Sequence, residues 1–313
     1  MHSAAPPDGE GLVLALDVGG TDIKVALQDA SGVFHGLRRL PTPRDAGSPG
    51  DVIVAEIARL LAEYRALASG EPVRSIGLVV PGLVDEAAGV GIFSANLGWR
   101  DYPFSAKVRS ATGLPVAFGH DVGLAGEAEM RLGAGRGLRD AVVMVIGTGI
   151  AGAVFSDGCR VHGGGFAGEI GHAPVPGGLP CACGATGCLE TVASAGAIGR
   201  RWARHTGTGH AGAREVLAAA TAGDREARRI WDEALEALAT VIGQVTAVLG
   251  TEAVILGGGL SQAGPALLEP LGRMVDSRLS FHRRPGLLAS ALGQDAGLMG
   301  AALAARDLLA VPA

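Results

Sequence analysis

Two long apolar segments of the chain are each interrupted by a short glycine-rich turn. The first runs from Leu12 to Leu27 and turns at Gly19-Gly20-Thr21, and the second runs from Val142 to Phe155 and turns at Gly147-Thr148-Gly149. Apolar runs of this length on both sides of a turn are typical of two antiparallel strands. Because the same unit recurs far along the chain, the pattern predicts two related α/β halves. Two unrelated hairpins in a glycine-rich protein are the alternative.

The remaining residues alternate between helical and strand patterns. In Asp51–Ser69, apolar residues recur every three to four positions behind Asp51, which is a suitable N-cap, so the segment predicts a helix. Strands are predicted at 73–80, 114–118 and 253–256, and further helices at 122–131, 211–221, 224–250 and 297–309. Strands that alternate with helices favour an α/β fold.

Composition narrows the class of protein. The chain has 313 residues, which is enough for two folded domains. Its residues are 48% hydrophobic and 18% charged, a composition unlike that of a disordered chain. The net charge of −5 and the lack of a Lys/Arg cluster argue against a nucleic-acid partner. No segment has the length of a membrane span or the pattern of a secretory signal, so a soluble cytoplasmic protein is expected.

No proline-rich or low-complexity linker separates the two expected domains. The first domain is placed at 1–118, with residues 1–10 expected to be disordered, and the second at 119–298. The final helix, 299–313, is expected to cross back and join the first domain.

Three glycine-rich turns follow apolar strands and are candidates for nucleotide binding. A turn without Cβ atoms lets backbone N–H groups approach phosphate closely. Asp17 ends the first strand and suits Mg²⁺, which prefers oxygen ligands. The same three turns could equally be ordinary turns, since none has the P-loop or GxGxxG pattern. The predicted nucleotide and phosphate residues are Asp17, Gly19, Gly20, Thr21, Lys24, Gly147, Thr148, Gly149, Gly257, Gly258 and Gly259.

A cluster of cysteines lies beside a histidine in the segment 172–190. Cys181, Cys183 and Cys188 with His172 match the ligand set of a tetrahedral structural Zn²⁺ site. Buried cysteines without a metal are the alternative, although a packing role explains three cysteines beside flexible glycines poorly. Cys159 stands apart and is expected to be a small buried residue.

Asp121 follows a predicted strand and precedes a predicted helix. In that position a carboxylate is an ordinary N-cap for the free N–H groups of the first turn. It is also placed as a general base would be, at the carboxyl end of a strand, where it can take a proton from a substrate hydroxyl. Local sequence does not decide between the two roles.

Four motifs together resemble the ROK family, whose kinase members phosphorylate glucose, fructose, allose, N-acetylglucosamine and N-acetylmannosamine. The motifs are LDVGGTDIK, HDVGLAGEAE, GGGFAGEIGHAPV and CACGATGCLE, and the similarity runs from Leu12 to the C-terminus. The resemblance implies two actin-like, hexokinase-type (ribonuclease H-like) α/β domains with an interdomain cleft. It also implies ATP and Mg²⁺ as cofactors, a structural Zn²⁺, and a homodimer or a dimer of dimers.

The resemblance assigns roles to individual residues. Asp121 is implied to deprotonate a sugar hydroxyl, usually that on C6, for in-line attack on the γ-phosphate. His172 is implied to bind zinc through one ring nitrogen and to face the sugar with the other. The implied sugar-binding residues are Gly82, Asn96, His120, Asp121, Glu169, His172 and Glu190.

One position departs from the family pattern. The residue before the catalytic Asp is usually Asn in these kinases, and here it is His120. Either His120 makes an equivalent hydrogen bond and glucose remains the substrate, or the hydroxyl pattern that it reads differs. Amino sugars, other hexoses and C7-cyclitols are then the alternatives. Asn96 and Trp99, in SANLGW, resemble the glucokinase version of the sugar loop and favour glucose.

Two other classes of protein compete with a sugar kinase. ROK repressors carry a helix-turn-helix domain before the kinase-like fold, but only about ten residues precede the first strand in this sequence. A non-catalytic sugar-sensing or scaffold protein is disfavoured because Asp121 and both phosphate turns are retained. The sequence does not decide between ATP and polyphosphate as the donor.

Overall fold

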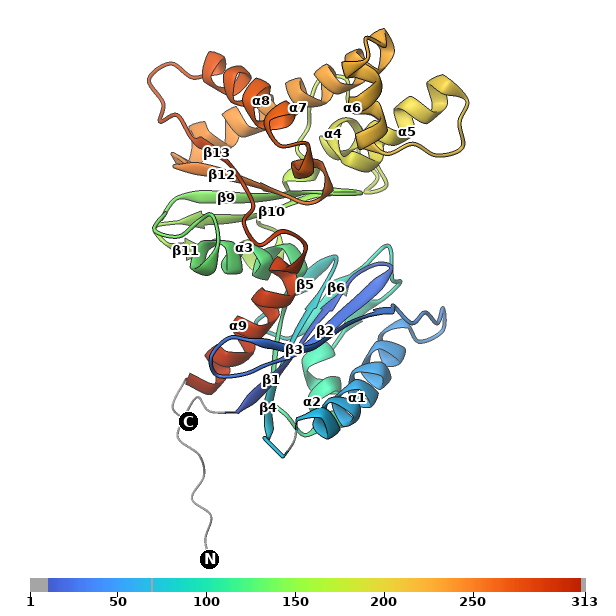
Figure 1. The fold of residues 1–313 in the computed structure, drawn as a ribbon, viewed down its shortest axis with the longest axis vertical. Helices are drawn as coiled ribbons and strands as arrows, with labels where there is room; N and C mark the ends of the chain where they lie inside the picture. Colours follow the sequence, from blue (N-terminus) through green and yellow to red (C-terminus); the bar gives the residue numbers. More distant parts are fainter. Residues whose placement is uncertain (1–10, 69, 311–313) are drawn as a thin grey trace, which may run out of the picture. The chain divides into compact units, whose positions relative to one another are not determined.

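Both glycine-turn segments form antiparallel hairpins in the computed structural model, which describes residues 11–68 and 70–310. The expected disorder of residues 1–10 concerns residues outside this range. The described residues divide into two compact units (Figure 1). Unit 1 contains the residues up to Ala128 and those from Asp295 onward, and unit 2 contains Glu129–Gln294. None of the described helices combines the length and hydrophobicity that a membrane crossing requires.

Each unit is built on a five-stranded mixed sheet, and the two sheets have the same strand order and the same strand directions. In unit 1 the order is β3 (Phe34–Pro41), β2 (Asp22–Gln28), β1 (Leu12–Val18), β4 (Val73–Val80) and β8 (Val116–His120). In unit 2 it is β11 (Cys159–Arg160), β10 (Ile150–Ser156), β9 (Ala141–Ile146), β12 (Ala253–Gly257) and β13 (Gly286–Ala289). The prediction of two related α/β halves is confirmed.

Strand β1 shows why unit 1 has three layers. Successive side chains of a strand point to opposite faces. Leu14 and Leu16 pack against helices α1 (Pro49–Leu67) and α2 (Phe104–Thr112), while Val13 and Ala15 pack against α9 (Ala296–Ala310). Figure 1 shows α9 on one face of this sheet and α1 with α2 on the other. A small sheet of β5 (Leu83–Asp85), β6 (Val90–Phe93) and β7 (Arg100–Tyr102) completes the unit.

Helices also cover both faces of the unit 2 sheet. One face packs on α4 (Glu190–Ala193), α5 (Ala195–Thr206), α6 (Ala213–Thr221), α7 (Arg225–Leu249) and α8 (Pro265–Arg278). Short 3₁₀ turns lie at Gly163–Gly165, Ile170–His172, Gly259–Ala263 and Gly293–Asp295. Met130, in the last turn of α3 (Asp121–Leu132), packs on the opposite face.

The division between the units falls inside α3 and not at the expected position between residues 118 and 119. Leu124, in the first part of α3, belongs to a unit 1 core with Val13 and Val79. Met130, near its end, packs on Val143 and Ile255 of unit 2. One continuous helix therefore contributes to both cores, which a boundary drawn from local sequence does not anticipate.

The approach of α9 to β4 depends on a glycine. A Cβ atom on Gly77 would lie 1.9 Å from the carbonyl oxygen of Ala301, and Ser75 Oγ donates a hydrogen bond of 2.9 Å to the carbonyl of Ala305. Backbone atoms cannot move aside as a flexible side chain can. Any side chain at position 77 would therefore push the helix away from the sheet.

We expect Gly77→Ala to lower the free energy of unfolding by about 1–3 kcal/mol, the usual cost of overpacking a close contact. Urea unfolding followed by circular dichroism measures the change. Gly272→Ala is the matched control, because its nearest neighbour, Leu287 Cδ1, would be 3.9 Å from the new Cβ. The control should be neutral or stabilised by up to about 1 kcal/mol, as for Gly→Ala within a helix. Equal effects of the two substitutions would contradict the account of α9 packing.

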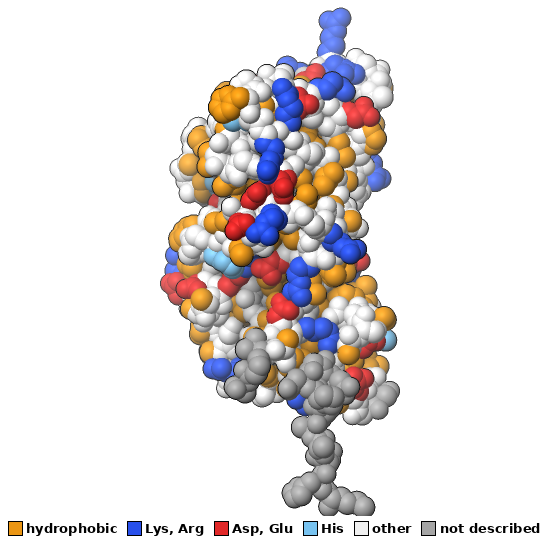
Figure 2. Space-filling model, turned by 90° about the vertical axis from the view of Figure 1, so that its left-hand side faces the viewer, with side chains coloured by type: hydrophobic (Ala, Val, Ile, Leu, Met, Phe, Trp, Pro, Cys, Tyr) orange, Lys and Arg blue, Asp and Glu red, His pale blue; other side chains and the backbone are white. Residues whose placement is uncertain are grey.

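Figure 2 shows acidic and basic side chains interspersed on one face of the molecule. No continuous basic surface is visible on that face among the described residues.

Candidate active site

The first glycine turn joins β1 to β2 and presents two backbone N–H groups. Gly19 N–H donates to the carbonyl of Asp22 at 2.8 Å and closes the turn, whereas the N–H groups of Gly20 and Thr21 have no partner among the described residues. Thr42 holds the turn from β3's end, because its Oγ1 donates to the carbonyl of Gly19 at 2.8 Å. The turn is thus rigid and has free donors for an anion.

Asp17 lies at the end of β1, directly before this turn. Its carboxylate is 3.2 Å from Lys24 Nζ, and a Cβ on Gly297 of α9 would come within 2.9 Å of its Oδ2. Burial raises the pKa of Asp17, Lys24 opposes the rise, and the negative charge of Asp121 adds to it. The carboxylates of Asp17 and Asp121 are therefore close enough to interact, which is an arrangement that favours a divalent cation.

Asp121 is the first residue of α3 and follows β8 directly. Its Oδ1 accepts a 2.7 Å hydrogen bond from Val122 N–H and lies 3.1 Å from Nε2 of His120. Its Oδ2 has no partner in the part of the chain that the structure describes. His120 holds the N-cap position, since its Nδ1 accepts from Gly123 N–H, and Asp121 is the first helical residue. One oxygen of Asp121 is held by the helix end, while the other remains available to accept a proton.

His120 is held by one hydrogen bond to its backbone and one to its ring. Its N–H donates to Glu86 Oε1 at 2.9 Å, and its Nδ1 accepts from Gly123 N–H at 3.3 Å. Because Nδ1 acts as an acceptor, we assign the neutral ring proton to Nε2, on the side of Asp121. Glu86 was not predicted, and its position after β5 carries no motif that would have revealed it.

The loop that carries Asn96 is tied to the first glycine turn. Arg44 donates through Nη1 to the carbonyl of Asn96 at 3.0 Å and through Nη2 to the carbonyl of Gly20. The side chain of Asn96 is exposed, and Trp99 of the same loop is buried against Phe104, with ring centroids 4.9 Å apart. Arg44 was not predicted, because an isolated arginine in a coil segment gives no sequence signal.

Gly82 lies at the base of the same loop. It has a φ of 102°, and a Cβ there would lie 2.3 Å from the carbonyl oxygen of Phe93. Only glycine fits both restrictions. Unit 1 therefore holds all of the following predicted residues: Asp17, Gly19, Gly20, Thr21, Lys24, Gly82, Asn96, His120 and Asp121.

The second glycine turn joins β9 to β10 in unit 2 and repeats the geometry of the first. Gly147 N–H closes it on the carbonyl of Gly149 at 2.9 Å, and the N–H groups of Thr148 and Gly149 have no partner within the described ranges. Gly258 packs against the end of β9, since its φ is 81° and a Cβ would lie 2.5 Å from the carbonyl oxygen of Ile146. The structure therefore brings 147–149 and 257–259 together.

Three predicted sugar-binding side chains also lie together in unit 2. His172 Nε2 is 3.7 Å from Glu169 Oε2, and His172 Nδ1 is 4.0 Å from Glu190 Oε1. Glu190 in turn adjoins the second glycine turn, because its Oε2 accepts from Ile150 N–H at 3.4 Å. Glu169, His172 and Glu190 are thus directly connected to the glycine turn 147–149.

The ligand atoms of His172, Cys181, Cys183 and Cys188 converge within 4.8 Å of one another. The Cys183 and Cys188 sulfurs are 3.6 Å apart, and Cys181 Sγ is 3.7 Å from His172 Nδ1. Tetrahedral zinc with Zn–S bonds of about 2.3 Å requires sulfur–sulfur separations of about 3.8 Å. The donor set and its spacing therefore fit Zn²⁺.

The three cysteines of this cluster differ in how readily they ionise. Burial raises the pKa of Cys181 to about 12 and also raises that of Cys188, whereas the Ala185 backbone N–H lowers the pKa of Cys183. Thiols that resist ionisation need a nearby positive charge to become thiolates.

Cys159 is exposed, so the expectation that it is buried is wrong. Strand β11 is a two-residue edge strand that leaves the side chain of Cys159 uncovered.

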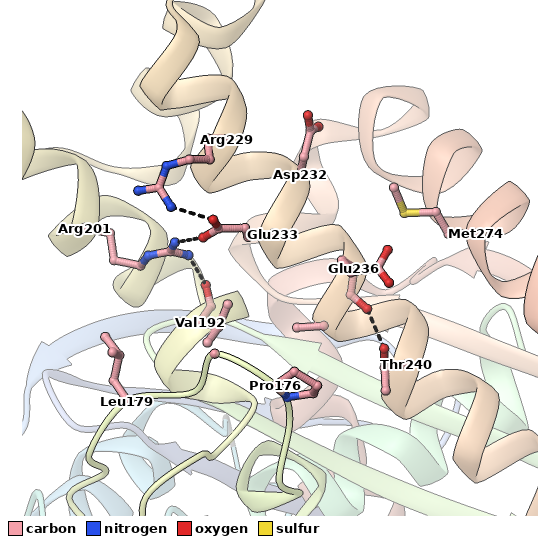
Figure 3. Close-up of a pocket in the computed structure, with 12 residues that line it drawn as sticks. Pro176, Leu179, Val192, Arg201, Arg229, Asp232, Glu233, Glu236, Thr240 and Met274 are labelled. Atoms are coloured by element: carbon pink, nitrogen blue, oxygen red, sulfur yellow. Dashed lines mark hydrogen bonds and ion pairs between the residues drawn. The ribbon is translucent and has the colours of Figure 1, made fainter.

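A cavity of about 830 Å³ lies elsewhere in unit 2, between the loop 176–179 and helices α5, α7 and α8. Figure 3 shows that Glu233 accepts from both Arg201 and Arg229 at its edge. None of the predicted site residues lines this cavity.

Comparisons with known proteins agree with this architecture. The sequence model of the ROK family matches residues 13–307. A glucokinase from Halalkalibacterium halodurans is 34% identical over 92% of this chain and 92% of its own. An N-acetylmannosamine kinase from Shigella flexneri is 32% identical over 94% and 98%. The crystal structure of a ROK family glucokinase from Streptomyces griseus in complex with glucose and AMPPNP is 30% identical, with a TM-score of 0.79 over 95% of this chain and 100% of that chain. The chain has the actin-like sugar kinase fold of these neighbours and belongs to the ROK family.

Proposed function

We propose that the protein is an ATP-dependent sugar kinase that converts glucose to glucose 6-phosphate. The observation that carries the proposal is the carboxylate of Asp121, which is fixed through Oδ1 and open at Oδ2. The glucokinase relative at 34% identity and the similar glucokinase structure with glucose and AMPPNP support the same reaction.

In the proposed reaction Asp121 Oδ2 accepts the proton of the C6 hydroxyl. The hydroxyl oxygen then forms a bond to the γ-phosphorus, the bond from that phosphorus to the β–γ bridging oxygen breaks, and ADP leaves with the electron pair. The hydrogen bond from Val122 N–H keeps the carboxylate in one orientation during this step. Positioning and electrostatics supply most of the rate enhancement in phosphoryl transfer.

The two glycine turns are proposed to hold the phosphates of ATP. The free N–H groups of Gly20, Thr21, Thr148 and Gly149 are suitable donors for phosphate oxygens. Asp17 would hold Mg²⁺, which neutralises charge on the transferred phosphate. Residues 257–259 would leave room for the base and ribose.

Two groups of residues are proposed to bind the sugar. Asn96, Gly82 and His120 would serve from unit 1, and Glu169, His172 and Glu190 from unit 2. We propose that His172, Cys181, Cys183 and Cys188 bind a structural Zn²⁺. With Nδ1 towards the cysteines, the Nε2 of His172 stays on the side of Glu169, where it can bind a hydroxyl.

A homodimer in the cytoplasm is the proposed setting. Thiolate zinc sites are typical of reducing compartments, and twofold assemblies are the commonest among soluble oligomers.

Neither ATP nor polyphosphate is favoured as the phosphate donor by the geometry of the turns alone. ATP is proposed because a similar glucokinase structure contains AMPPNP.

A substrate panel tests the proposed function. ADP release coupled to NADH oxidation is measured with glucose, mannose, N-acetylmannosamine, N-acetylglucosamine and a C7-cyclitol. We expect the highest kcat/KM for glucose. A higher kcat/KM for an N-acetylated sugar would indicate that the protein shares the substrate class named for its N-acetylmannosamine kinase relatives. Sugar binding without ADP release would instead indicate a sugar-sensing regulator.

We expect His120→Asn to keep this order of substrates and to change kcat by less than about threefold. The neutral ring that Gly123 N–H selects has one Nε2–H donor, and the asparagine amide supplies an equivalent one. The same panel measures the outcome. A change of preferred sugar in the variant would show that His120 determines specificity, and the equivalence would be refuted.

A further inference from the structure

A second cavity in unit 2, of about 340 Å³, lies beside the glycine turn 147–149. It is lined by Thr148 of that turn, by Glu190, and by three arginines of α5, namely Arg200, Arg201 and Arg204. The proposed function gives Thr148 and Glu190 a role and leaves the three arginines without one.

The side chain of Arg200 can lie next to the glycine turn because Gly196 has no side chain to block it. A Cβ on Gly196 would be 2.9 Å from Arg200 Nη1 and 2.8 Å from the carbonyl oxygen of Thr148. Gly196 N–H also donates to the carbonyl of Gly147 at 3.3 Å, which ties the start of α5 to the turn. The guanidinium therefore runs back along α5 over a position without a side chain and ends beside Thr148.

Arg201 is already neutralised, whereas the other two arginines are not. Arg201 pairs with Glu233 and donates to the carbonyl of Val192 at 3.4 Å. Arg200 and Arg204 are exposed and have no ion pair or hydrogen bond with any residue that the structure describes. One turn apart on α5, they present two free cations to the same cavity.

The one carboxylate in the lining does not cancel this charge. Glu190 carries one negative charge against the two unpaired guanidinium groups, and its Oε2 already accepts from Ile150 N–H. The amino-terminal end of α5 adds positive potential at the same place, since helix N-termini carry partial positive charge. Exposed arginines on a solvated helix face are common, but these two share a cavity with Thr148 of the glycine turn.

We propose that Arg200 and Arg204 form an anion subsite that binds phosphoryl oxygens next to the glycine turn 147–149. Guanidinium groups bind phosphate through two parallel hydrogen bonds, which makes arginine the suitable residue for this task. The phosphoryl group can come from the phosphate chain of the donor or from a phosphorylated sugar. The inference rests on the proposed function only through the role of the turn.

Isothermal titration calorimetry at low salt with inorganic tripolyphosphate and with glucose 6-phosphate tests the subsite. We expect Arg200→Ala and Arg204→Ala each to weaken binding of tripolyphosphate at least tenfold, as loss of a charge-assisted hydrogen bond requires. Arg200→Lys should recover part of the loss. Arg273→Ala is the control, because that side chain is 73% exposed on α8 and does not line the cavity. It should change binding less than twofold.

The two probes distinguish the sources. Weaker tripolyphosphate binding assigns the subsite to the donor phosphates, and weaker glucose 6-phosphate binding alone assigns it to a phosphorylated sugar. Unchanged binding of both probes in both alanine variants, with melting temperatures equal to wild type, overturns the proposal. ADP release is measured separately, so a failed kinase assay with arginine-dependent binding would reject the proposed function and keep the subsite.

Discussion

Replacing Asp121 with asparagine is expected to lower kcat by about 10²–10⁴-fold, the range that general-base catalysis usually contributes. Asparagine keeps the shape of the side chain and can still accept the Val122 N–H at the start of α3. It cannot accept the proton of the sugar hydroxyl. The KM for glucose should therefore change little, and the loss should be confined to the chemical step.

Asp224→Asn is the matched control for this substitution. Asp224 is the N-cap of α7, where its side chain accepts from Ala227 N–H at 2.9 Å, and it belongs to none of the proposed sites. Both variants thus preserve a side-chain hydrogen bond at the start of a helix, but only one removes the proposed base. The kcat of Asp224→Asn should equal that of wild type. If Asp121→Asn retained kcat within threefold, Asp121 would have a structural role at the start of the helix and no more.

Substitution of Cys188 by serine is expected to abolish zinc binding and to raise the KM for the sugar at least tenfold. The zinc would fix the ring of His172 through Nδ1, and that ring adjoins both Glu169 and Glu190. Removing a residue that only orients a metal ligand already costs about 10–100-fold in metal affinity or activity, so loss of the metal should cost at least as much. Because metal binding is coupled to folding, the melting temperature should also fall.

Elemental analysis by mass spectrometry, steady-state kinetics and calorimetry measure these effects. Cys159→Ser is the control, since Cys159 is exposed on β11 and lies outside the cluster. Wild type and the control should contain about one zinc per chain, as four converging ligands imply. If wild-type protein without zinc had the same KM for the sugar as zinc-containing protein, the role proposed for the cluster would be refuted.

The regular elements were predictable because each has a strong local pattern. The hairpins around residues 19–21 and 147–149, the strand at 73–80 and the long helix after Asp224 were located to within a few residues. The exposed strand β3 and the short strands β5, β6 and β7 were not predicted, because they bury few side chains and so lack a clear hydrophobic period. Helix α2 was missed for the same reason, with Phe104 and Val108 as its two buried residues.

The residue types of the candidate site could be proposed from sequence, but their connections could not. Motifs identified Asp17, Asp121 and the Cys/His cluster, because each of these depends on residues close together in sequence. Arg44 and Glu86 hold the site through contacts with residues distant in the chain, which only the fold brings near. Arg200 was equally hidden, since its place beside Thr148 depends on how α5 meets the turn. The two uses of the Asp121 carboxylate could be separated only when its two oxygens were seen in different surroundings.

A product balance tests directly whether the protein transfers a phosphoryl group from ATP to glucose. Wild-type protein is incubated with glucose, ATP and Mg²⁺, and ADP and glucose 6-phosphate are quantified together by ³¹P nuclear magnetic resonance. We expect the two products to accumulate in equal amounts and both to be lost in Asp121→Asn. ADP formed without a sugar phosphate, or equal product formation by wild type and Asp121→Asn, would contradict this expectation.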